Sequence, residues 1–122
     1  MRRWTRVLAG IALTAAVAAA QAHAHLRHSA PADGSVVSAS PRQVVLDFSE
    51  AARLTAAWIQ RSGGSRTPIA GLPEQSAASV AVSLPALSAG RYELSWRALS
   101  ADGHIMPGHI HFTVTAHGEV AR

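Results

Sequence analysis

The residues best suited to chemistry in this chain are its seven histidines, which fall into two groups. The positions are His23, His25, His28, His104, His109, His111 and His117, and none occurs from residue 29 to residue 103. Imidazole transfers protons near neutral pH and binds transition metals through a ring nitrogen. Two groups far apart in sequence can meet in a folded domain, so the distribution predicts one shared site.

The first 22 residues have the pattern of an export signal. Arg2, Arg3 and Arg6 precede the apolar run 7–20, which is shorter than the ~20 residues that span a bilayer. Small residues at Ala20 and Ala22 form a cleavage pattern, so we expect a signal peptide at 1–22 and a mature domain at 23–122. Cleavage after Ala24 is the alternative. Either choice leaves a histidine, His23 or His25, at the new N-terminus.

Composition excludes several classes of protein. Cysteine is absent, so disulfides, thiolate metal sites and cysteine nucleophiles are ruled out, and any metal must use nitrogen and oxygen ligands. The formal charge of +4 for the full chain depends largely on the three arginines of the expected signal. Without them the domain is almost neutral, and its arginines are scattered among acids. We therefore expect no nucleic-acid partner, since phosphate binding needs a concentrated basic face.

Apolar residues alternate with period two, which is typical of half-buried strands. We expect strands at 44–48, 54–60, 80–84, 92–96 and 110–114, with short ones near Leu26 and Ile69. About seven strands and no convincing helix predict an all-β domain, a seven-stranded sandwich or barrel. Trp58 and Trp96 are expected in its core. His109 and His111 share one side of the last strand, where solvent exposure is favoured over binding of a second ion.

A chain-terminal histidine has an uncommon property, because its amine and its ring Nδ1 can chelate one metal ion. A second imidazole completes three nitrogens in a T shape, the histidine brace, and this tetragonal arrangement favours Cu(II). With His23 terminal, His25 at position three offers a competing square-planar geometry. The far half of the site is expected in the turn that holds Asp102 and His104, since these supply a carboxylate oxygen and an imidazole nitrogen.

Three motifs together resemble the CopC/YobA-like copper-binding proteins of the bacterial periplasm. They read HAHLRHSAPADGS, SPRQVVLDFSE and LSAGRYELSWRALSADGHIMPGHIHFTV, in order along almost the whole mature chain. The resemblance implies a Greek-key β-sandwich of cupredoxin-like shape that is exported, binds Cu(II) and serves copper resistance, storage or delivery. It implies ligands at His23 with its amine, Asp102 and His104, with Glu50 as a carboxylate near the metal. It also implies a CopD-like inner-membrane partner.

The chain departs from the members of that family that carry a methionine-rich loop for Cu(I). Its matching stretch, residues 61–79, contains neither methionine nor histidine, and Met106 is the single methionine after the signal. Since Cu(I) prefers soft sulfur ligands, no methionine-type Cu(I) site can be assembled. We expect a monomer that binds one Cu(II) per chain.

Two other functions are compatible with parts of the pattern. A copper-dependent oxidase or monooxygenase, such as the polysaccharide enzymes that share the histidine brace, would need an open coordination position and an aromatic substrate platform. One tyrosine and two tryptophans after the signal make such a platform unexpected. A metal-free sandwich scaffold would show no Cu(II) binding at all. We expect a copper carrier or scavenger and no enzyme.

Overall fold

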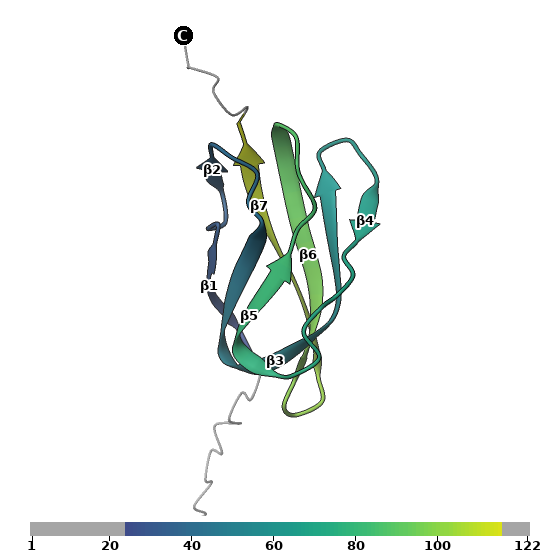
Figure 1. Ribbon diagram of the computed structural model, residues 1–122. Helices are drawn as coiled ribbons and strands as arrows, with labels where there is room; N and C mark the ends of the chain where they lie inside the picture. Colours follow the sequence, from purple (N-terminus) through teal and green to yellow (C-terminus); the bar gives the residue numbers. More distant parts are fainter. Residues whose placement is uncertain (1–23, 116–122) are drawn as a thin grey trace, which may run out of the picture.

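The computed structural model describes residues 24–115, and every regular element among them is a β-strand (Figure 1). No helix in this part of the chain could cross a membrane. The strands are β1 (Leu26–Ala30), β2 (Ser35–Val37), β3 (Gln43–Arg61), β4 (Arg66–Pro68), β5 (Ala77–Ser83), β6 (Gly90–Ser100) and β7 (Ile105–Val114). The all-β prediction is therefore confirmed.

The long strand β3 is shared by two layers of the domain. Its first half pairs antiparallel with β1 and β5, and its second half pairs antiparallel with β6 and β4. The register shifts between Asp47 and Ala52, where the strand passes from one layer to the other. The sequence predicted two separate strands here, because a shift in register interrupts the alternation without ending the strand.

The second layer continues from β3 through β6 and β7 to β2. β6 and β7 form an antiparallel hairpin, while the three residues of β2 pair parallel with the end of β7. Figure 1 shows the β6–β7 turn at the lower end of the molecule, where β1 also begins. The start of the described chain and this turn therefore lie at the same end of the domain.

The core lies between the layers and is built from alternate residues of the strands. Leu46, Leu94, Ile110 and Phe112 are among its fully buried members. Trp96, 3% exposed, meets Phe48 edge to face at 6.4 Å between ring centres. Burying such side chains is the main favourable term in folding a domain of this size.

The prediction that Trp58 belongs to the core is wrong. Trp58 is half-buried and faces outward, with the guanidinium carbon of Arg66 4.2 Å and that of Arg97 5.5 Å from its ring centre. The cause is a register shift between Leu54 and Ala56. One extra residue in a strand moves every later side chain to the opposite face, so Ala57 and Ile59 point inward.

Candidate metal centre

The β6–β7 turn places Asp102 and His104 at the tip of the hairpin. The Gly103 N–H donates to the Ser100 carbonyl at 3.0 Å, and the Ser100 N–H donates to the His104 carbonyl at 3.0 Å. This is a three-residue hairpin loop in which the last loop residue takes a left-handed conformation. Gly103 has φ +85°, which only glycine adopts without strain. Gly103 is thus required by the turn itself, whatever its neighbours Asp102 and His104 bind.

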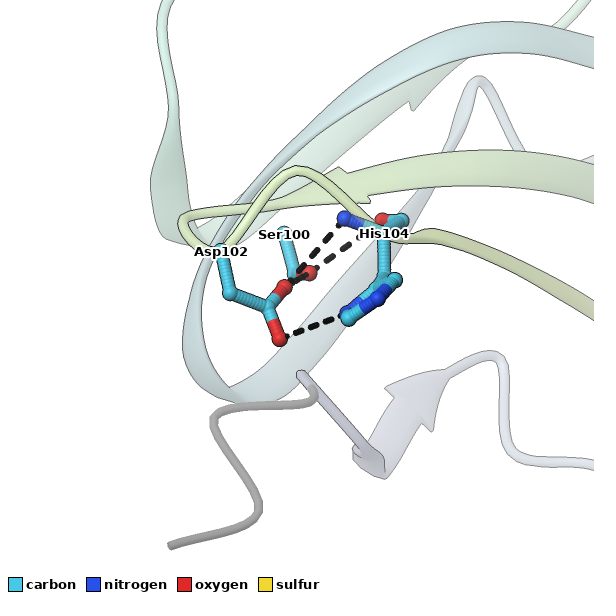
Figure 2. A network of polar contacts seen from close by, with 3 residues as sticks. All are labelled: Ser100, Asp102 and His104. Carbon is cyan, nitrogen blue, oxygen red and sulfur yellow. Dashed lines mark hydrogen bonds and ion pairs between the residues drawn. The ribbon is translucent and has the colours of Figure 1, made fainter.

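Three side chains of this turn form one polar network (Figure 2). The Ser100 hydroxyl donates to Oδ1 of Asp102, and the His104 N–H donates to the same oxygen at 3.2 Å. The other carboxylate oxygen, Oδ2, lies 2.8 Å from Nδ1 of His104. Asp102 is therefore held by contacts at both of its oxygens.

These contacts set the protonation state of Asp102. The hydrogen bond from Ser100, and after it the one from the His104 ring, hold the pKa of the Asp102 carboxyl well below its usual range. An ionised carboxylate only accepts hydrogen bonds, so Nδ1 of His104 carries the proton in this contact. The lone pair of the ring is then on Nε2. This carboxylate–histidine arrangement is the usual way in which proteins orient a metal-binding imidazole.

Ser100 anchors the network in the interior of the domain, whereas Asp102 and His104 reach the solvent. Ser100 is 4% exposed, whereas the side chains of Asp102 and His104 are 26% and 65% exposed. Buried Ser100 pairs with Ala52 of β3, which is itself in the core. The turn thus presents one imidazole and one carboxylate to solvent from a rigid base.

The first residues that the structure describes are attached to β3 close to this turn. His25 donates its N–H to the Ser49 hydroxyl at 2.9 Å, and the Ser49 N–H donates to the His25 carbonyl at 2.7 Å. Ala24, only 3% exposed, is part of the core. Ser49 precedes Ala52, the partner of Ser100, by three positions on β3. Residues 24 and 25 are therefore fixed at the end of the sandwich that carries Asp102 and His104.

The structure brings together some of the expected ligands and not others. Asp102 and His104 lie together, in contact through Oδ2 and Nδ1. His25 and Glu50 are exposed near the same end, and within residues 24–115 no three His, Asp or Glu side chains form a metal-binding group. His23 lies outside the described residues. Ser100 was not predicted from the sequence, because its contact with Asp102 depends on the geometry of the hairpin.

Fold and turn together define a small β-sandwich domain with a histidine–carboxylate pair exposed at one end. Residues 26–115 match the CopC domain, and the chain belongs to the CopC family. Protein YobA of Escherichia coli strain K12 is 36% identical over 98 residues, covering 76% of this chain and 79% of the relative. Copper resistance protein C of Escherichia coli is 33% identical over 119 residues, covering 88% and 94%.

Solved structures agree with this assignment. CopC from Methylosinus trichosporium OB3b superposes with a TM-score of 0.69 at 30% identity, covering 81% of this chain and all of that one. PcoC, a methionine-rich copper resistance protein from Escherichia coli, gives a TM-score of 0.56 at 32% identity, covering 76% and 99%. The family resemblance and the sandwich fold expected from the sequence are confirmed.

Proposed function

We propose that this chain is an exported protein that binds Cu(II) and serves copper resistance as a carrier or scavenger. Membership of the CopC family, which includes relatives described as copper resistance proteins, supports a role in copper binding. The observation that carries the proposal is the exposed His104 ring, whose Nδ1 is held by ionised Asp102 so that the lone pair on Nε2 is left for a metal ion. Imidazole nitrogen and carboxylate oxygen are donors suited to Cu(II) and poorly suited to Cu(I).

His23 supplies the other half of the proposed site. Cleavage after Ala22 makes it the terminal residue, so that its amine and Nδ1 chelate the ion. One peptide bond, ~3.8 Å between Cα atoms, joins His23 to the buried Ala24. The attachment of Ala24 and His25 at the end that carries Asp102 and His104 supports this assignment. The proposed ligands are thus the His23 amine and imidazole, Nε2 of His104 and Asp102, for one Cu(II) per chain at this site. Asp102 binds the ion once its contact with Nδ1 of His104 has opened.

Glu50 and His25 have subsidiary roles in the proposal. Glu50 is an exposed carboxylate of β3 directly after Ser49, the residue that holds the backbone of His25. It is proposed to orient ligands or to bind the ion weakly from the side of β3. The imidazole of His25 becomes a ligand only in the alternative square-planar geometry.

The proposed function is transport or storage of copper in the periplasm, with no catalytic step. The 61–79 stretch has no thioether ligand for Cu(I), so exchange between two redox-specific sites in one chain is not part of the proposal. Delivery to a CopD-like inner-membrane protein is its expected continuation. Release of copper from the protein then depends on reduction of Cu(II) or on a partner that binds the ion with better ligands.

The decisive experiment alters the N-terminus and leaves the described fold intact. Mass spectrometry of the exported protein first establishes which residue is terminal. One Gly placed ahead of His23 then moves the amine away from the imidazole, and Cu(II) affinity should fall by orders of magnitude with an unchanged circular dichroism spectrum. His28→Ala is the control, because His28 pairs with Asp47 at 2.6 Å on the surface. Unchanged affinity in the extended protein would refute the chelate.

A further inference from the structure

A second group of histidines and carboxylates lies on the outer face of the β6–β7 hairpin. His109 and His111 are exposed on the same side of β7, with ring centres 5.3 Å apart and ring planes at 77°. Glu93 of β6 is directly opposite His111 in the register, and its Oε2 lies 2.9 Å from Nε2 of His111. Glu93 and Ser100 are seven positions apart on β6, roughly 23 Å of strand, so this group is distinct from the candidate copper site.

The backbone of His111 is held by hydrogen bonds at its N–H and at its carbonyl. Its N–H donates to Oδ1 of Asp33 at 2.8 Å, and its carbonyl accepts from the Gly34 N–H at 2.6 Å. Asp33 Oδ1 is also 3.9 Å from Nδ1 of the same ring. The imidazole therefore stands between two carboxylates, with Glu93 at Nε2 and Asp33 at Nδ1, on a backbone that has little freedom to move.

We propose that His109, His111 and Glu93 bind one divalent transition-metal ion, Zn²⁺ or Cu²⁺, as a second metal site. The spacing of the two rings fits one shared ion. With metal–nitrogen distances of about 2.0–2.1 Å, each ring centre lies about 3.2 Å from the ion, so two imidazoles at 90–109° have centres roughly 4.5–5.2 Å apart. The observed 5.3 Å is close to the upper value.

The spacing of His111 and Glu93 fits the same ion. Atoms 2.9 Å apart that each bind a metal at about 2.0–2.2 Å subtend an angle of roughly 80–95°, the cis angle of tetragonal Cu²⁺. A tetrahedral Zn²⁺ needs about 3.3–3.4 Å, an opening of about 0.4–0.5 Å that an exposed Glu can provide. The ion would replace the hydrogen bond between Nε2 and Oε2.

One movement is needed to complete the site. No three His, Asp or Glu side chains within residues 24–115 already converge around a common point, so the His109 ring must turn toward Nε2 of His111. Exposed side chains change rotamer within nanoseconds, and His109 has an exposed position on β7. The site is therefore assembled on binding from residues already in contact.

Charge and access also favour a cation here. His111 and Glu93 line an open cleft of about 690 Å³ together with Arg91, a cation two positions from Glu93 on the same side of β6. Asp33 and Glu93 outweigh this single positive charge when the histidines are neutral. The remaining coordination positions can be filled by water from the cleft, as is usual for a partly exposed metal site.

The test is a Zn²⁺ titration followed by equilibrium dialysis and metal analysis. The protein is first loaded with one equivalent of Cu(II), and the titration is repeated with His104→Ala, which impairs the proposed copper site. In both forms we expect one Zn²⁺ per chain in addition to any copper. His109→Ala and His111→Ala should each weaken Zn²⁺ binding at least about tenfold, and Glu93→Gln by a smaller factor.

His28→Ala is the matched control, because His28 with Asp47 is also an exposed imidazole–carboxylate pair, and within residues 24–115 no ring contact joins it to another histidine. It should leave Zn²⁺ binding unchanged. Absence of a bound Zn²⁺ in the copper-loaded protein, or binding that is insensitive to His109→Ala and His111→Ala, would overturn the second site. Neither result bears on the N-terminal copper site, because the His104→Ala background separates the two.

Discussion

The indole of Trp96 occupies the space that a side chain at Gly108 would need. The two residues are directly opposite in the β6–β7 ladder, and a Cβ built on Gly108 would be 2.5 Å from Cε2 and Cζ2 of the indole. Trp96 in turn packs edge to face on Phe48 of β3. The close contact between indole and backbone therefore couples the hairpin that carries the candidate site to the other half of the core.

Gly108→Ala should destabilise the domain, because the indole must move out of a packed position. Overpacking of this kind costs about 1–3 kcal/mol in free energy of unfolding. Urea denaturation followed by tryptophan fluorescence measures the change. Thr113→Ala is the control, since Thr113 is on the same strand and faces away from the core, and it should cost clearly less. Equal stability of Gly108→Ala and the wild type would show that the indole does not lie against Gly108 in solution.

Local periodicity was enough to predict the class of fold and most of the strand positions. The features that periodicity could not predict depend on pairing between segments that are distant in the sequence. The short strand β2 exists because Ser35–Val37 pairs parallel with β7, and three residues are too few to display a period. β3 was divided in two and Trp58 placed on the wrong face because register shifts occur at two points in that strand. Such shifts depend on the partner strand and leave little trace in the sequence.

The candidate site was predictable to a similar degree. Asp102 and His104 follow from their position in an Asp-Gly turn after a strand, and the structure places them in contact. The role of Ser100 requires the hairpin geometry, which points its hydroxyl back at the carboxylate. The pairing of His111 with Glu93 depends on the β6–β7 register, and a shift of one residue would have separated them.

Removing the Ser100 hydroxyl should change the titration of Asp102. This hydrogen bond is the main cause of the lowered pKa, so Ser100→Ala should raise the pKa of Asp102 toward its ordinary value of about 3.9. Carbon-13 NMR of the side-chain carboxyl measures it. Ser95→Ala, on the same strand, is the control and should leave the Asp102 titration unchanged.

The same pKa has a consequence for stability. A carboxyl whose pKa is lower in the folded state stabilises the fold above the ordinary Asp value of about 3.9, and this contribution is lost as the pH falls toward the folded-state pKa. Ser100→Ala should therefore reduce the loss of stability on acidification. An unaltered pKa and an unaltered pH profile in this variant would contradict the network in Figure 2.

Substitutions at the turn should separate the two proposed ligands by their effects on copper. His104→Ala removes an imidazole nitrogen and should lower Cu(II) affinity by more than the roughly 10–100-fold that loss of an outer partner costs. Asp102→Ala should have a smaller effect, because it removes one oxygen donor and the group that orients the ring. Absorption and electron paramagnetic resonance spectra of the copper-loaded variants measure the change. Wild-type spectra for both variants would remove Asp102 and His104 from the copper site.

The last prediction concerns the oxidation state of the bound metal. The proposed ligands are nitrogen and carboxylate oxygen, whereas Cu(I) prefers soft sulfur and low coordination numbers. Met106 is the single methionine after residue 22 and lies half-buried in β7. Ascorbate with a Cu(I) chelator should therefore strip the loaded protein readily, while a Cu(II) chelator of moderate strength should fail under oxidising conditions.

Two results of that experiment would contradict the proposal in different ways. Copper that resists ascorbate in the native protein but is lost from His109→Ala and His111→Ala would show that the imidazole pair on β7 holds Cu(I) without any thioether. Copper that resists ascorbate in these variants as well would show that the N-terminal site itself tolerates Cu(I). In that case the absence of methionine from residues 61–79 does not determine the redox preference, and reduction is excluded as the route of copper release.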